Sequence, residues 1–145
     1  MSRESRVTAG ILLVLLPAVV YGGTSILSLL IGDPAYAQNE LRQDLWRAGH
    51  AHAGVLLVLS LVTLRYVDEA NLPGRLKSFA RHSIPAAAVL LPAAFFLSVL
   101  SPDATEPNAM IYLAFVGAAL LASGVLVLGI GLIRKPEGPM KGPKV

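Results

Sequence analysis

Four long apolar runs without a charged residue dominate this sequence. They cover residues 7–32, 48–64, 84–101 and 109–133 and are 26, 17, 18 and 25 residues long. A helix needs roughly 20 apolar residues to cross the hydrocarbon core of a bilayer, with a range of about 17–25. Lipid offers the backbone no hydrogen-bond partners, so each run must satisfy its own backbone groups, as a helix does. The runs therefore predict an all-α fold, a four-helix transmembrane bundle.

Composition excludes several other classes of protein. Hydrophobic residues make up 54% of the chain and charged residues only 14%, whereas soluble domains carry about 25% charged residues. The chain has no cysteine, which rules out a disulfide framework, a thiolate metal site and a thiol nucleophile. Its formal net charge is +3, but the cations flank the apolar runs, so they indicate membrane topology rather than nucleic-acid binding.

We expect one transmembrane domain over residues 1–134 and a flexible basic tail over residues 135–145. The four spans are predicted at about residues 7–32, 44–66, 83–101 and 108–133. The triplet Ala35-Tyr36-Ala37 resembles a signal-peptidase site. The run before it is much longer than the 7–15 residues of a signal-peptide core. We therefore expect the first run to be retained as a span, and whether the triplet is ever cleaved stays open.

Lys and Arg residues are unevenly distributed between the spans. The N-terminus and the first loop hold two each, the second loop and the tail hold four each, and the third loop holds none. With four spans, both termini and the second loop share one side, which then carries ten of the twelve cations. Because positively charged short loops stay in the cytoplasm, we expect a multi-pass plasma-membrane protein with both termini cytoplasmic.

The fourth run contains a regular pattern of small residues. Gly117, Gly124 and Gly131 recur every seven residues and therefore fall on one helix face. Small residues let helices approach closely in lipid. The pattern predicts helix packing, and packing within the bundle is favoured over a seam between copies of the chain.

Two histidines, His50 and His52, lie inside the second run. Ionisable residues within a span are costly and suggest a functional site, and imidazoles bind haem and metals. On a regular helix the two positions are about 200° apart, so they would not share one ion. His52 falls on the arc that carries the small and hydroxyl residues of the span, so we expect it to face the bundle and His50 not to. Alternatively, Gly49 and Gly54 break the helix and both imidazoles converge as a metal clip.

Hydrogen-bonding residues occur at a similar depth in all four predicted spans. We expect them to form a polar layer near the outer face; its members are Ser28, His52, Ser98 and Tyr112. A structural role in fixing the helix register is favoured over a small polar ligand site. Such hydrogen bonds contribute about 0.6 kcal/mol each in membranes.

The segment 45–61, LWRAGHAHAGVLLVLSL, together with Tyr21-Gly22-Gly23-Thr24-Ser25, carries a resemblance. It resembles uncharacterised small four-span integral membrane proteins of high-GC Gram-positive bacteria, through the motif RAGHAHAG. This resemblance implies no activity. The Gly-His-x-His pattern is also similar to haem-ligating helices of respiratory oxidases, but the further spans and histidines of such an oxidase are missing.

Two function classes remain. The first is a non-catalytic membrane protein, an accessory subunit of a larger membrane complex or a self-associating chain, with the lipid bilayer as its environment. The second is a haem- or metal-binding membrane protein that uses His50 or His52. An enzyme acting alone is disfavoured, because no Asp or Glu lies within a run to orient a histidine.

Overall fold

The computed structural model describes residues 1–134, and the predicted basic tail lies outside the described residues. Helices are the only regular secondary structure in this part of the chain, which contains no strand. Its elements are α1 (Arg3–Gly32), α2 (Pro34–Ala37), α3 (Glu40–Tyr66), α4 (Gly74–Ser98), η1 (Ala109–Tyr112) and α5 (Leu113–Ile133). Four helical segments, α1, α3, α4 and η1 with α5, are long and apolar enough to cross a membrane. The all-α fold with four such helices is confirmed.

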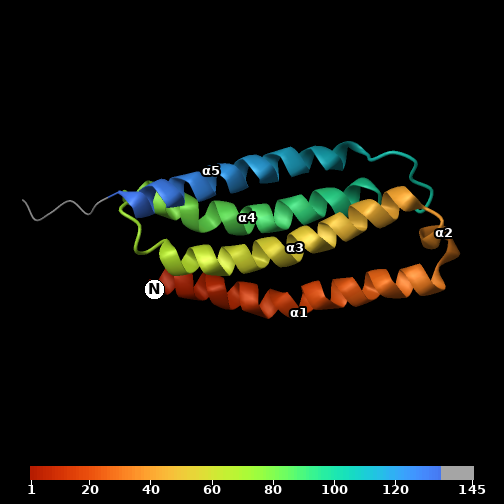
Figure 1. Ribbon diagram of the computed structural model, residues 1–145, viewed down its shortest axis with the longest axis horizontal. Helices are drawn as coiled ribbons and strands as arrows, with labels where there is room; N and C mark the ends of the chain where they lie inside the picture. The colour runs from red at the N-terminus through yellow and green to blue at the C-terminus, as the bar shows by residue number, and fades with distance from the viewer. Residues whose placement is uncertain (135–145) are drawn as a thin grey trace, which may run out of the picture.

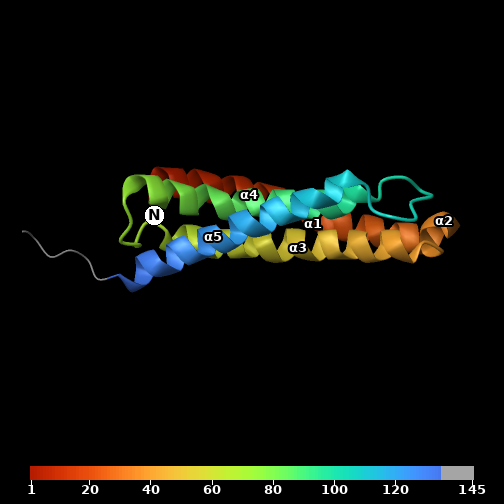
Figure 2. The ribbon, with the colours of Figure 1, turned by 90° about the horizontal axis from the view of Figure 1, so that it is seen from above.

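The long helices lie side by side in the order α1, α3, α4, α5 (Figure 1). Packing is extensive between α4 and α5, between α3 and α4, and between α1 and α3. Helices α1 and α5 lie at the two edges of this row, and α5 crosses α4 obliquely (Figure 2). The arrangement is therefore open, and the edge helix α1 packs mainly along α3.

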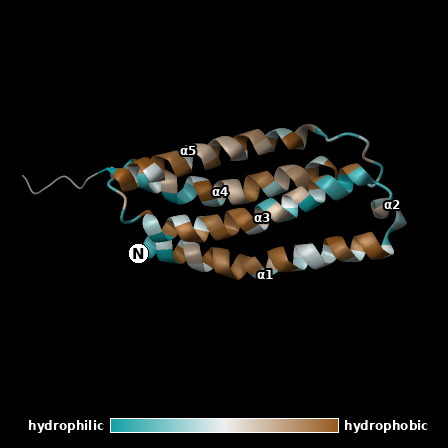
Figure 3. Cartoon of the chain, in the orientation of Figure 1, coloured by the Kyte–Doolittle hydropathy of each residue, from teal (hydrophilic) through white to brown (hydrophobic). Residues whose placement is uncertain are grey.

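The two ends of the molecule differ in what they bring together. The N-terminus, the loop between α3 and α4 and the last turn of α5 lie at one end, here called the N-terminal end (Figure 1). The opposite end, called the α2 end, holds α2, the start of α3, the end of α4 and η1. Hydrophilic residues gather at the N-terminus and in the first half of α3, while the middle of the long helices is hydrophobic (Figure 3).

Side-chain caps define where several of these helices begin. The Ser2 hydroxyl accepts a hydrogen bond from the Ser5 backbone N–H at the start of α1. Asp33 caps α2, and Asn39 caps α3 by accepting from the Arg42 backbone N–H. Such caps satisfy donors that have no partner inside the helix. The Asn39 amide also donates to two carbonyls of the 102–104 loop, which ties the connections together at the α2 end.

The three glycines of α5 lie against other parts of the same chain. Gly117, Gly124 and Gly131 are buried. A Cβ on Gly117 would lie 3.2 Å from the Leu91 backbone nitrogen, and those on Gly124 and Gly131 would collide with Ser83 and Leu72 respectively. Two of these glycines thus allow α5 to approach α4 closely, and the third makes room for the loop that precedes α4.

Candidate functional site

The structure corrects the predicted orientation of the two histidines. Helix α3 continues through Gly49–Gly54, so the imidazoles do not converge as a metal clip. His52 is exposed, whereas His50 is half-buried, which makes the predicted burial of His52 wrong. The His52 Nδ1 is 2.7 Å from the Ala48 carbonyl oxygen, and its ring lies 5.1 Å from that of Phe95. His52 is therefore engaged with its own helix and with the side of α4.

A glycine pair in α1 explains why His50 turns inward. A Cβ on Gly23 would lie 2.8 Å from His50 Nε2, and one on Gly22 would lie 3.8 Å from Nδ1. The imidazole thus lies against the backbone of α1, in space that a side chain at Gly23 would fill. The hydroxyls and Gly49 on the opposite arc of α3 pack elsewhere: Ser60 bonds to the Leu56 carbonyl and Gly49 lies against Phe96. Small residues mark close contact here, but they do not identify where the histidine points.

His50 lines a cavity of about 280 Å³ between α1, α3 and α4. The α1 wall runs from Leu12 to Gly22, and the α4 wall runs from Pro85 to Phe96. His50 alone among its described lining residues has a polar side chain. In the part of the chain that the structure describes, neither ring nitrogen of His50 has a hydrogen-bond partner. The cavity is thus an apolar space with one available hydrogen-bonding group.

The predicted polar outer layer does not form as a hydrogen-bonded cluster among the described residues. Ser28 donates to the Thr24 carbonyl and Ser98 to the Phe95 carbonyl, each within its own helix. Ser98 is buried, whereas Ser28, His52 and Tyr112 are exposed. A hydroxyl in a helix readily bonds to the preceding turn, and this local bond replaces the predicted contacts between helices.

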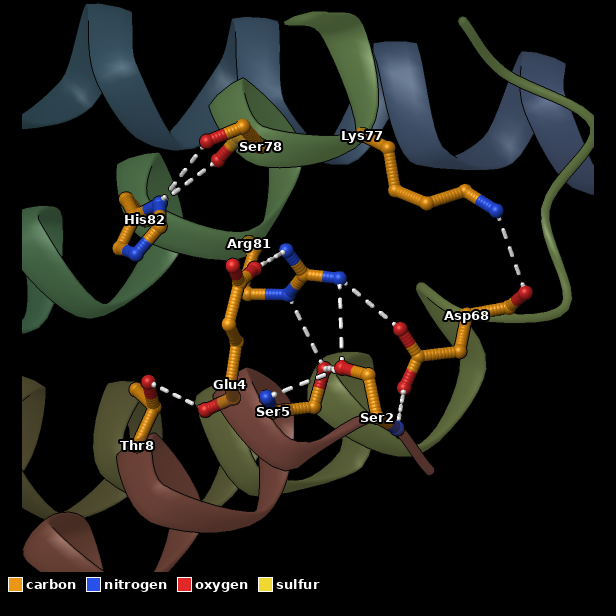
Figure 4. Close-up of polar contacts among 9 residues, drawn as sticks. All are labelled: Ser2, Glu4, Ser5, Thr8, Asp68, Lys77, Ser78, Arg81 and His82. Carbon is orange, nitrogen blue, oxygen red and sulfur yellow. Dashed lines mark hydrogen bonds and ion pairs between the residues drawn. The ribbon is translucent and has the colours of Figure 1, made fainter. Parts of the chain in front are cut away.

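The positions of the three histidines limit how the described chain could bind a metal or haem. Among residues 1–134 no group of three or more His, Asp or Glu side chains is placed to hold a metal ion. The third histidine, His82, is exposed and its Nδ1 lies 2.8 Å from the Ser78 carbonyl oxygen (Figure 4). Within one chain, His50 is therefore the histidine placed to meet a ligand inside the helix row.

A buried charge cluster at the N-terminal end was missed by the sequence analysis. Arg81 of α4 is only 6% exposed and pairs with Glu4 of α1 and with Asp68 of the loop after α3. Its Nη2 is 2.9 Å from Asp68 Oδ1, and its Nε donates to the Ser5 hydroxyl at 3.0 Å. Figure 4 shows the guanidinium surrounded by these side chains and by Ser2. The cluster joins α1, α4 and the α3–α4 loop.

The Asp68 carboxylate accepts hydrogen bonds from both the N-terminus and Arg81. Its Oδ2 accepts from the Ser2 backbone N–H at 2.6 Å. Burial by itself raises the pKa of Asp68, but the hydrogen bonds from Ser2, Arg81 and Ser5 outweigh it and lower the pKa to about 2. The carboxylate is therefore charged at neutral pH. The signal in the sequence was a loop acid, Asp68, thirteen residues before Arg81 near the start of the third span.

A second polar cluster closes the α2 end. Arg42 is buried, donates from Nε to the Val99 carbonyl at 3.2 Å, and places its guanidinium 4.7 Å from the Trp46 ring centre. Gln43 donates to the carbonyls of Tyr36 and Ala37. Tyr36 is completely buried, and burial raises the pKa of its hydroxyl against the lowering effect of two nearby arginines. This cluster holds α2 against α3 and α4, and Arg42, which the sequence analysis used only for topology, is its centre.

Comparison with known proteins identifies no relative. No family model matches the sequence, and no curated protein and no solved structure matches it significantly.

Proposed function

We propose that this chain is a non-catalytic, multi-pass plasma-membrane protein that acts by lateral association within the bilayer. It serves as an accessory subunit or associates with copies of itself, and both its termini are cytoplasmic. The observation that carries this proposal is a polar face on the edge helix α1 that no other part of the described chain covers.

This face, called the α1 polar face, consists of Tyr21, Thr24, Ser25 and Ser28 and continues to Gly32. All of them are exposed except Ser25, which is partly exposed. Taking about 100° per residue, the face is rotated by roughly 100–200° from Gly23, which touches α3. It also forms a shallow hollow on the surface of α1. The α1 polar face therefore points away from the rest of the chain.

Such a face is poorly suited to lipid and well suited to another helix. The hydroxyls of Thr24, Ser25 and Ser28 donate to carbonyls of α1 itself, those of Tyr21 and Thr24. These bonds leave the backbone hydrogen bonds of α1 in place. Thr24, Ser28 and Gly32 recur every four residues, the spacing of small residues at helix–helix interfaces in membranes. A neighbouring helix packed there would approach closely and form hydrogen bonds with the hydroxyl groups, whereas hydrocarbon tails form none.

Cysteine cross-linking tests this association, because the chain has no cysteine of its own. Ser28→Cys should form a disulfide-linked dimer, or a link to a partner subunit, in oxidised membranes. Leu126→Cys on α5, also exposed, is the matched control and should not. The bulky Thr24→Leu substitution should abolish the association. Equal cross-linking at both positions, or no cross-link and no co-purifying protein at Ser28→Cys, contradicts the proposal.

Labelling with a membrane-impermeant maleimide tests the orientation. Arg75 and Glu106 are exposed; Arg75 lies in the first turn of α4 and Glu106 in the loop between α4 and η1, at opposite ends of α4. In intact cells Glu106→Cys should be labelled and Arg75→Cys should be protected. The reverse pattern would invert the proposed topology.

A second function is favoured by the position of His50 in the cavity: haem or ligand binding. One chain offers one inward histidine, so haem with two histidine ligands would need two chains. An absorption spectrum of the protein in mild detergent tests this. A Soret band lost in His50→Ala and kept in His52→Ala would support haem binding, whereas a band lost only in His52→Ala would contradict the role of His50.

A further inference from the structure

We propose that the His50 cavity binds a lipid-soluble ring compound that carries a carbonyl oxygen, of the quinone class, with the His50 N–H donating to that oxygen. The inference rests on the cavity between α1, α3 and α4 and is independent of the α1 polar face. It concerns binding only, with no chemical change in the ligand.

The first step is the unsatisfied imidazole. His50 lies six residues after the predicted start of this span at residue 44 and three residues after Arg47, which is about 9 Å and about 5 Å along the helix at 1.5 Å per residue. His50 therefore lies in the outer part of the span, with its side chain lining the cavity inside the helix row. A polar group that leaves water without a new hydrogen bond is destabilising. Neither nitrogen of His50 finds a partner among residues 1–134, so an external oxygen would satisfy it.

The second step is the character of the cavity that His50 lines. A water molecule in a buried site needs two to four polar partners, and the cavity offers the side chain of His50 alone among its described lining residues. A mainly apolar molecule with one hydrogen-bonding oxygen matches this lining. A donor at His50 selects an acceptor such as a carbonyl.

The third step is size and access. An engineered cavity of about 150 Å³ holds benzene, so about 280 Å³ accommodates a substituted or fused ring. Two lining residues on opposite walls, Leu15 of α1 and Val89 of α4, are exposed. The cavity therefore reaches the lateral surface, where a ring could enter from lipid and leave an apolar tail outside.

The single tryptophan of the chain provides the assay. Trp46 lies with its ring 6.0 Å from that of Phe96, which lines the cavity. The probe is 2-methyl-1,4-naphthoquinone, added to the purified full chain in mild detergent. Quinones quench tryptophan fluorescence at short range, so binding should give saturable quenching above the linear quenching of a tryptophan analogue in the same detergent.

Three variants separate the roles of the cavity and the imidazole. His50→Ala should weaken binding about tenfold, the effect of one lost hydrogen bond. Ala88→Phe places a ring inside the cavity and should abolish saturable quenching. His52→Ala is the matched control, because its ring lies outside the cavity, and it should bind as the original chain does. Far-UV circular dichroism checks that each variant is folded.

A competitor tests the hydrogen bond without any substitution. In the original chain, 2-methylnaphthalene, which has the ring but no carbonyl, should relieve the quenching only at concentrations at least tenfold above that of the quinone. Several results would overturn the proposal: unchanged binding in His50→Ala, equal competition by the hydrocarbon, or absence of saturable quenching. A Soret band that depends on His50 would also overturn it, since haem would then occupy the ligand position. If His50→Ala does not fold, Ala88→Phe and the competition decide.

Discussion

The charge cluster at the N-terminal end makes stability depend on pH in a defined direction. The pKa of Asp68 is about 2 in the folded chain against an ordinary value of 3.8. At 1.36 kcal/mol for each pKa unit, the difference corresponds to roughly 2 kcal/mol of stability. Because the folded pKa is the lower one, this contribution is present above about pH 4 and disappears as the pH falls toward 2. Asp68→Asn removes it at every pH.

The assay is unfolding of the detergent-solubilised protein by sodium dodecyl sulfate, followed by far-UV circular dichroism between pH 7 and pH 2. Asp68→Asn should be less stable than the original chain by roughly 2 kcal/mol at pH 7, and the difference should shrink as the pH approaches 2. Asp103→Asn is the matched control, because Asp103 is exposed in the loop at the α2 end, and it should follow the original chain throughout. If Asp68→Asn loses stability with acid as steeply as the original chain does, the assignment to Asp68 is refuted.

Two further predictions concern glycines that allow close contacts. Gly117→Ala should lower the free energy of unfolding by about 1–3 kcal/mol, because the new methyl group meets the backbone of α4. Gly129→Ala is the control and should not lower it, because a Cβ at Gly129 has nothing within 4 Å. Equal stability of the two variants would contradict this packing. Gly23→Ala should displace the His50 ring and weaken naphthoquinone binding. Gly10→Ala is the control, because a Cβ there has nothing within 4 Å, and it should leave binding unchanged. Unaltered binding in both variants would show that the contact with Gly23 does not position His50 for binding.

The orientation of the histidines illustrates where sequence analysis failed. Helical geometry separated His50 and His52 correctly, since α3 is regular where they lie. The choice of the inward histidine was wrong, because it assumed that hydroxyl and small residues on α3 mark a polar interior. The deciding feature lies on another helix: Gly22 and Gly23 leave room on α1 for an imidazole. A signal was present in the sequence as a glycine pair in an apolar run, but nothing in it states which neighbour fills the space.

The charge cluster shows the same limit for ionic contacts. Arg81 was counted as one of the cations that set the topology. Its partner Glu4 is 77 residues away in the chain and Asp68 is 13 residues away. Only the packing of α1 and α4 beside the α3–α4 loop brings these groups together, and burial then makes the pairing obligatory.

Local physics, by contrast, is readable from the sequence. Long runs without charge must be helical if they lie in lipid, because each backbone group has to bond within its own segment, and the four long apolar helices follow from that requirement. The seven-residue spacing of Gly117, Gly124 and Gly131 likewise places them on one face by helical geometry alone. What the tertiary structure decided is which faces meet. The order of the helices, the exposure of the α1 polar face, the inward turn of His50 and the burial of Arg81 all depend on contacts between residues far apart in the chain, and no local periodicity encodes such contacts.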